Sequence, residues 1–183
     1  MRPGGSKAKG SAWERSVGQN LSLWLTSGTR NDLFSRTVLS GGQFTRSQGL
    51  RGASGDLMPN HPAAFCFLEK FTVECKHWRD AGLQEFLLKG SKKSLLARAI
   101  KQAEVPGKIP LLIVKENFVP AFLISYNASV SYLVSGYGTL HVLVNGQYIL
   151  MTFEDFLSIP PERIIGEPKP ITVPSSQRVR PIT

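Results

Sequence analysis

Thr72-Val73-Glu74-Cys75-Lys76 places a carboxylate and an ammonium group on a short segment that is otherwise apolar. Side chains alternate between the two faces of a β-strand, so Glu74 and Lys76 share one face and Cys75 points into the core. Burying charges without a purpose is costly, which favours a functional role for both. A carboxylate can bind a divalent cation, and a neighbouring lysine can orient or polarise the water that attacks a phosphodiester. We therefore expect hydrolytic phosphate chemistry at this strand.

Glu-x-Lys alone is a weak signal, because it also occurs in ordinary salt-bridged strands. Two acidic residues upstream strengthen it. Asp56 precedes Glu74 by 18 residues, which lets two antiparallel strands bring both carboxylates around a hard cation such as Mg²⁺. Taken alone, Asp56 beside Gly55 is more typical of a turn. Glu14 projects within the apolar stripe of a helix that begins near Ser11, and so faces the core or the sheet. The alternative is that Glu14 reaches back to Ser11 as the glutamate of a capping box.

Hydrophobic patterning and turn signals predict a mixed α/β or α+β domain with one central sheet. Expected helices cover residues 11–27, 92–104 and 153–157, and expected strands cover residues 33–39, 43–46, 56–58, 65–67, 71–76, 111–115, 118–125, 140–144 and 148–152. The last two strands flank Asn145-Gly146, the strongest hairpin signal in the chain. We expect a flexible basic segment at residues 1–10, one domain at residues 11–158 and a flexible proline-rich tail at residues 159–183.

The composition indicates a polyanionic partner. The 183 residues include 22 Lys plus Arg against 13 Asp plus Glu, a formal net charge of +9, and nucleic acid is the first candidate. Docking to acidic proteins or lipid headgroups is the alternative. Two cysteines exclude a disulfide scaffold and a cysteine-rich zinc site. We find no secretory signal and no apolar run of membrane-spanning length, and we expect a cytoplasmic protein with no membrane partner.

Four short motifs carry a likeness to a known family: Lys9-Gly10-Ser11-Ala12-x-Glu14-Arg15, Ser40-Gly41-Gly42, Gly55-Asp56 and Val73-Glu74-Cys75-Lys76. Together they resemble the PD-(D/E)xK nuclease superfamily, and within it the archaeal-type Holliday junction resolvases and their phage-encoded relatives. The resemblance implies a restriction-endonuclease-like core, in which helices flank a central mixed β-sheet. It also implies that Glu14, Asp56 and Glu74 hold a metal ion and that Lys76 is the catalytic lysine. The implied metal is Mg²⁺, with Mn²⁺ as a substitute.

These observations predict a metal-dependent DNA endonuclease with branched or junction DNA as the favoured substrate. Resolving a four-way junction takes two symmetric cuts, so we expect a homodimer. The expected DNA contacts, chosen by positive charge or by the resemblance, are Lys9, Arg15, Arg36, Ser40, Arg46, Arg51, Lys92, Lys93 and Lys101. The alternatives are a nicking, restriction-like or single-strand-specific nuclease, or a non-catalytic nucleic-acid-binding module on the same fold.

Overall fold

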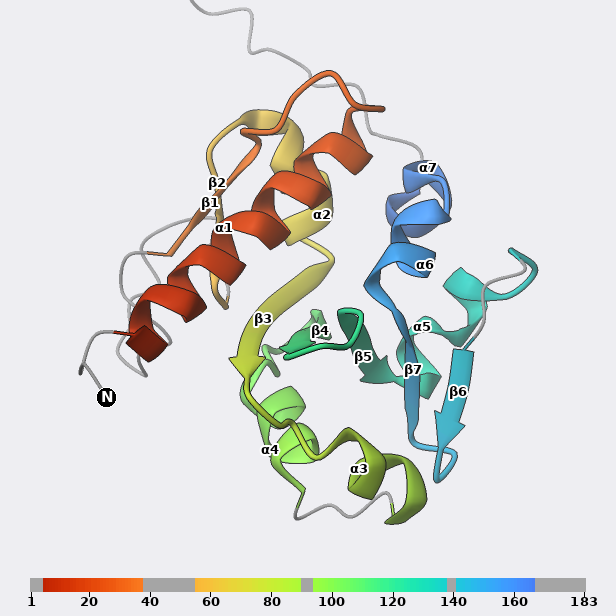
Figure 1. The fold of residues 1–183 in the computed structure, drawn as a ribbon. Coiled ribbons are helices and arrows are strands. Elements are labelled where there is room, and N and C mark those ends of the chain that lie inside the picture. The colour runs from red at the N-terminus through yellow and green to blue at the C-terminus, as the bar shows by residue number, and fades with distance from the viewer. Residues whose placement is uncertain (1–4, 38–54, 90–93, 138–140, 167–183) are drawn as a thin grey trace, which may run out of the picture.

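A five-stranded sheet forms the centre of the computed structural model, which describes residues 5–37, 55–89, 94–137 and 141–166 (Figure 1). The strands are β3 (Phe71–Trp78), β4 (Ile109–Glu116), β5 (Phe122–Tyr126), β6 (His141–Val144) and β7 (Tyr148–Thr152). Their order across the sheet is β3-β4-β5-β7-β6. β3 and β4 run parallel, whereas all other neighbours are antiparallel. The predicted mixed sheet flanked by helices is confirmed.

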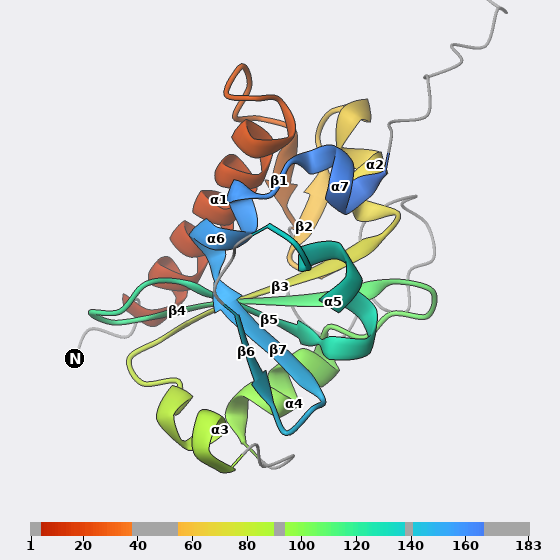
Figure 2. The same cartoon turned by 90° about the vertical axis from the view of Figure 1, so that its right-hand side faces the viewer.

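Helices cover both faces of this sheet (Figure 2). The described helices are α1 (Gly5–Leu25), α2 (Phe65–Leu68), α3 (Leu83–Lys89), α4 (Leu95–Gln102), α5 (Asn127–Val134), α6 (Phe153–Ser158) and α7 (Pro161–Ile165), with a short 3-10 turn, η2 (Pro62–Ala64), before α2. α3 and α4 pack on one face, and the other face carries α1, α5, α6 and α7. Because parallel strands need a crossover connection, α3 and α4 form the link between β3 and β4. A two-stranded antiparallel ribbon of β1 (Phe34–Arg36) and β2 (Leu57–Pro59) lies beside α1.

The sheet buries apolar side chains on both faces, and β4 shows this most clearly. Leu111 and Ile113 belong to the apolar cluster under α1, whereas Leu112 and Val114 belong to the cluster under α4. All four side chains are at most 2% exposed. The continuous apolar run at residues 111–114, within the strand expected at 111–115, is typical of a strand that is covered on both faces.

The predicted strand at residues 65–67 is wrong, because Phe65–Leu68 form helix α2. The side chain of His61 caps the preceding 3-10 turn and accepts a backbone hydrogen bond, which starts the chain in a helical conformation. Phe67 and Leu68 are both fully buried in the same cluster. Adjacent residues on a strand would point to opposite faces, so the helical turn buries more apolar surface here.

The helical structure extends beyond the predicted domain limits on both sides. α1 begins at Gly5, so residues 5–10 continue the helix that was expected to begin near Ser11. Lys7, Ala8 and Lys9 have high helix propensity and favour the extension, whereas Gly5 and Gly10 do not. On the other side, Pro161–Ile165 form α7 inside the predicted flexible tail, and Ile164 is fully buried. Proline at the first helical position favours a helix start at that point.

Local turn and capping signals were reliable at the β6–β7 hairpin and at the start of α6, but not at Ser11, which lies inside α1. Asn145 and Gly146 have φ values of 52° and 67°, as a type I′ hairpin turn requires. Thr152 caps α6 by accepting from the backbone N–H of Asp155 at 3.0 Å. α4 is capped by the Ser94 side chain. The predicted strand at 43–46 and the predicted start of the helix at 92–104 lie outside the described residues. α3 and α5 form where no helix was predicted.

Candidate active site

Strand β3 carries Glu74 and Lys76 on one face, as the alternation of side chains predicts. The backbone neighbours Val73 and Cys75 are buried in the cluster under α1. Glu74 and Lys76 keep 14% and 28% of their side chains exposed, and the Nζ atom of Lys76 lies 2.5 Å from Oε1 of Glu74. The two groups therefore form a partly desolvated ion pair at the edge strand of the sheet.

Asp56 reaches β3 through a close backbone contact at Gly55. The Asp56 N–H donates to the carbonyl of Val73 at 2.8 Å, and Oδ2 of Asp56 accepts from the N–H of Cys75 at 2.7 Å. Gly55 pairs with Val73 in a parallel bridge. The expected antiparallel pairing of the two acid-bearing strands is wrong, because β2 pairs with β1, and the bridge to β3 is the parallel one at Gly55.

Glycine at position 55 is required by this contact. Gly55 has a φ of +75°, and a Cβ atom there would lie 2.1 Å from the carbonyl oxygen of Val73. A side chain would therefore meet both backbone strain and a steric clash. Gly55 stands where the resembled motif has proline, and in this chain it permits the approach that brings Asp56 to β3.

Glu14 joins the site from helix α1, which packs on β3 and on the β1–β2 ribbon (Figure 1). Its side chain is 13% exposed, and Oε2 accepts from Nε of Arg36 at 2.8 Å. The capping-box alternative is wrong, because the helix begins at Gly5 and Ser11 lies inside it. The neighbouring Trp13 donates its indole N–H to the carbonyl of Ile113 at 3.2 Å, which fixes the rotation of α1 against the sheet.

Crowding of these acids perturbs the titration of the groups at β3. The pKa of Asp56 is raised from 3.8 to about 6, first by burial, then by the charge of Glu74 and less by that of Glu14. Burial and the same acids raise the pKa of the Cys75 thiol well above its ordinary value, so it stays neutral. Burial is the largest single influence on Lys76 and acts to lower its pKa, but the hydrogen bond to Glu74 and the charges of Glu74 and Asp56 together outweigh it, so the pKa is raised. Lys76 is therefore a cation at neutral pH.

The acids have the right chemistry for a hard cation, although their side chains face other partners. Among residues 5–37, 55–89, 94–137 and 141–166, no three His, Cys, Asp or Glu side chains converge as a metal site. Glu14 faces Arg36, and Glu74 faces Lys76. Carboxylate oxygens are nevertheless the ligands that Mg²⁺ and Mn²⁺ prefer. Burial is the first cause of the raised pKa of Asp56 and repulsion by Glu74 is the second, and a cation would relieve that repulsion, so the residues fit such an ion.

Comparison with known families agrees with this geometry. A sequence model of the family described as "Phage putative PDDEXK endonuclease" matches residues 5–166. The chain belongs to this family. It is thus a nuclease of the PD-(D/E)xK type, as the β3 motif indicates. No curated protein and no solved structure matches the chain.

The predicted DNA contacts of this PD-(D/E)xK nuclease lie in different places. Lys9 and Arg15 are exposed on α1, whereas Arg36 is engaged with Glu14. Lys101 is exposed on α4 and lines a separate recess described below. The other predicted contacts lie outside the described residues; these are Ser40, Arg46, Arg51, Lys92 and Lys93. Within the part of the chain that the structure describes, no helix is long and apolar enough to span a bilayer.

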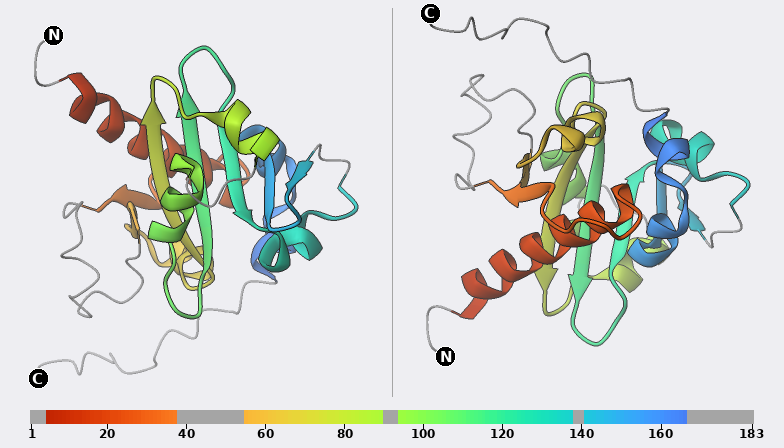
Figure 3. Two further views of the ribbon diagram at one scale, coloured as in Figure 1. Left: turned by 90° about the horizontal axis from the view of Figure 1, so that it is seen from below. Right: turned by 90° about the horizontal axis from the view of Figure 1, so that it is seen from above.

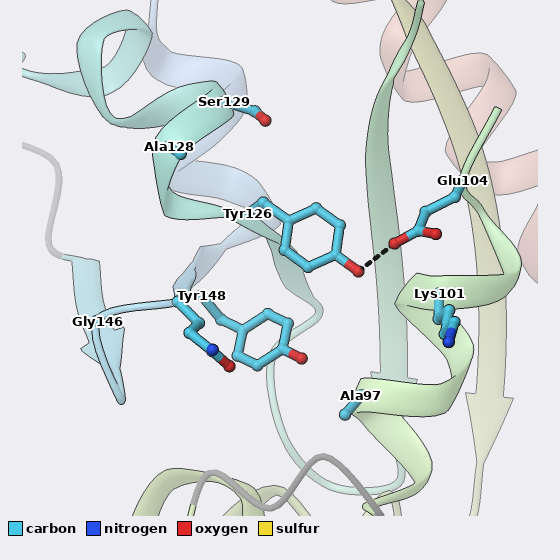
Figure 4. Close-up of a pocket in the computed structure, with 9 residues that line it drawn as sticks. Ala97, Lys101, Glu104, Tyr126, Ala128, Ser129, Gly146 and Tyr148 are labelled. Atoms are coloured by element: carbon cyan, nitrogen blue, oxygen red, sulfur yellow. Dashed lines mark hydrogen bonds between the residues drawn. The ribbon is translucent and has the colours of Figure 1, made fainter. Parts of the chain in front are cut away.

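An open recess of about 680 Å³, between α4, the end of β5 and the β6–β7 turn, was missed by sequence reasoning (Figure 4). The Tyr126 hydroxyl donates to Oε1 of Glu104 at 2.5 Å, and the Tyr126 ring stacks on Tyr148 with centroids 5.5 Å apart. Glu74 and Lys76 do not line this recess. Glu104 follows a helix and Tyr126 ends a strand 22 residues later, so no local pattern links them. Only the order of strands in the sheet brings them together.

Proposed function

We propose that this nuclease is a divalent-metal-dependent DNA endonuclease that hydrolyses phosphodiester bonds at the edge of β3, with four-way junctions as its preferred substrate. The observation that carries the proposal is that Asp56 is held on β3 by the backbone N–H of Cys75, between Glu74 and Lys76, where the charge of Glu74 contributes to its raised pKa. Acids forced together in a partly desolvated position are unfavourable for folding, and such perturbed groups are concentrated at functional sites. The family membership supports the same chemistry.

Each residue in this proposal has a separate task. Asp56 and Glu74 hold the metal, and Glu14 binds it directly or through water. The bound ion supplies Lewis-acid activation of water and of the scissile phosphate. Lys76 stays protonated because its pKa is raised, so it orients the attacking water and offsets the negative charge that develops on the phosphate. Arg36 positions the Glu14 carboxylate through their 2.8 Å contact.

Positive charge supports DNA as the substrate. The chain carries a formal net charge of +9, and Lys9 and Arg15 are exposed on α1. Phosphate contacts of this kind are lost steeply as the salt concentration rises. The preference for junctions and the homodimer rest on the resemblance to resolvases, since two symmetric cuts suit a two-fold assembly.

Cleavage of a labelled four-way junction beside a matched linear duplex tests the proposal, with Mg²⁺ or EDTA present. We expect paired, metal-dependent cuts on the junction and little cutting of the duplex. Lys76→Met keeps the side-chain stem and removes the charge, so it should lower the cleavage rate by about 100-fold or more. Arg30→Met is the matched control, because Arg30 forms an exposed ion pair with Asp32 and such pairs contribute little.

The other outcomes separate the alternatives. Equal cutting of junction and duplex would retain the nuclease and remove the junction preference. Cleavage in EDTA would contradict the metal requirement. Tight DNA binding with no cutting of any substrate would favour the non-catalytic binding module. A monomer bound to the junction in sedimentation velocity experiments, with both cuts still paired, would contradict the homodimer.

A further inference from the structure

The turn between β4 and β5 presents one aromatic side chain entirely to solvent. Phe118 is 103% exposed, whereas the next most exposed large hydrophobic residue in the described part of the chain, Tyr132, is 55% exposed. A phenyl ring in water forgoes the favourable burial that aromatic residues usually obtain. Nothing in the packing of the described residues accounts for a phenylalanine at this position.

The backbone of this turn holds Phe118 in an unfavourable conformation. Its φ is 67°, in the left-handed region that bulky side chains rarely adopt. Nζ of Lys115 donates to the carbonyl of Val119 at 2.9 Å, which closes the turn from one side. Pro120 restricts Val119 to extended conformations on the other side. The turn is therefore stiff, and strained positions of this kind are concentrated at functional sites.

The turn also lies at the end of the sheet where β3 leaves the candidate active site. Lys76 pairs in register with Val114, and Phe118 is four residues further along the chain. Two of these four residues belong to β4 and two to the turn, so at about 3.3 Å per strand residue Phe118 lies at most roughly 13 Å beyond Lys76 along the strand direction. Figure 3 shows the β4–β5 turn projecting past the end of β3, on the same side as the N-terminal end of α1. That part of α1 carries the exposed Lys9.

We propose that Phe118 is a wedge that inserts between adjacent bases of the DNA and unstacks them beside the cleavage site. The inference rests on the proposed function and names the feature of DNA that the site selects. Apolar side chains of nucleic-acid-binding proteins insert between base steps at the cost of unstacking them. That cost is smallest where stacking is already interrupted, so a wedge favours branched DNA over regular duplex. Because one base-pair step rises 3.4 Å, the cut should fall within about four steps of the opened step.

Fluorescence of 2-aminopurine tests the wedge without requiring cleavage. The probe is placed at successive positions near the branch point of a four-way junction and in a linear duplex of the same sequence. In a Lys76→Met background, binding should raise the fluorescence at one junction position, because the unstacked base is no longer quenched. Phe118→Ala should abolish that rise and weaken junction binding about tenfold, the size of one base–aromatic stacking contact. Duplex affinity should change little.

Three further variants distinguish the effect of the aromatic ring on DNA from any effect on folding. Phe118→Trp should retain the fluorescence rise, because it keeps an aromatic wedge. Phe118→Gly should abolish the rise while raising the melting temperature, since glycine relieves the positive φ. Tyr132→Ala, which truncates an exposed aromatic side chain on α5, should leave the signal intact.

The two proposals fail in different ways. An unchanged fluorescence rise and junction affinity in Phe118→Ala would overturn the wedge, and metal-dependent cutting by the parent protein would still support the nuclease. Conversely, loss of the rise in Phe118→Ala, with no cutting by the parent protein under any condition, would retain the wedge and refute the proposed catalysis.

Discussion

The carboxylate cluster at the edge of β3 and the recess beside α4 both hold acidic side chains, but they accommodate them differently. In the recess, one carboxylate, Glu104, accepts a hydrogen bond from Tyr126 in an exposed position. In the cluster, burial and neighbouring acids raise the pKa of Asp56 to about 6, although its backbone hydrogen bond acts against this. The recess satisfies its polar groups, whereas the cluster keeps charges together at a cost to folding. Such a cost is expected where the charges serve a reaction.

The largest expected loss of stability and cleavage follows from replacing Gly55, the glycine that brings Asp56 to β3. Gly55→Ala introduces a Cβ 2.1 Å from the Val73 carbonyl oxygen at a φ of +75°. Left-handed strain and overpacking together should lower the free energy of unfolding by about 2–5 kcal/mol. Cleavage should fall with it even at temperatures where the variant stays folded, because Asp56 is displaced from Cys75. Urea titration and junction cleavage at low temperature measure the two effects.

Gly28→Ala is the matched control for this substitution. Gly28 has a φ of +86°, but a Cβ there meets no atom within 4 Å. Backbone strain alone should cost about 1–2 kcal/mol, and cleavage should be unchanged. Equal losses of stability in the two variants would show that the close approach at β3 is unimportant.

The features of the site that sequence predicted best are those encoded within one element. The placement of Glu74 and Lys76 on one face of β3 follows from strand alternation over three residues. The position of Glu14 toward the sheet follows from the helical period, but its partner depended on where α1 begins. Because the helix extends to Gly5, Ser11 cannot cap it and Arg36 takes that place.

Contacts between distant segments could not be predicted from local patterns. The parallel bridge of Gly55 to Val73 depends on how the β1–β2 ribbon lies against the sheet, and the sequence suggested an antiparallel pairing instead. A short apolar run such as 65–67 is ambiguous between strand and helix, and the His61 cap decided it. The family likeness predicted that Asp56 and Glu74 meet, whereas spacing alone only allowed it.

Asp56→Asn should give the next largest change in the free energy of unfolding, and this change should stabilise the protein. The folded pKa of Asp56 is about 6, above its ordinary value of 3.8. Above pH 6 the carboxylate is charged in both states, so its unfavourable surroundings lower the stability of the wild type in full. Asparagine removes this cost, on the order of 1–3 kcal/mol at pH 7, while cleavage is lost. As pH falls from 6 toward 4, the native state takes up a proton first and the difference should disappear.

Asp32→Asn should change the stability at neutral pH in the opposite direction, and so serves as the comparison for Asp56→Asn. The hydrogen bond from Arg30 is the largest cause that lowers the pKa of Asp32 in the folded state. Its contribution to stability is therefore present at neutral pH and lost as pH falls through the lowered pKa. Thermal denaturation between pH 4 and pH 8 should show a small loss for this variant at pH 7. A loss of stability in Asp56→Asn as well would contradict the strained cluster.

The smallest expected effect lies in the recess, where Tyr126→Phe removes one hydroxyl and keeps the ring stacked on Tyr148. The lost hydrogen bond to Glu104 is exposed, so the free energy of unfolding should fall by at most about 1 kcal/mol. Junction cleavage should be unchanged, because the recess is not lined by Glu74 or Lys76. The free energies of unfolding of Tyr126→Phe and Asp56→Asn compare the two regions directly. Removing a polar group should destabilise the protein in the recess and stabilise it in the cluster at β3. A large loss of cleavage in Tyr126→Phe would instead place the recess on the DNA path and make Lys101 a phosphate contact.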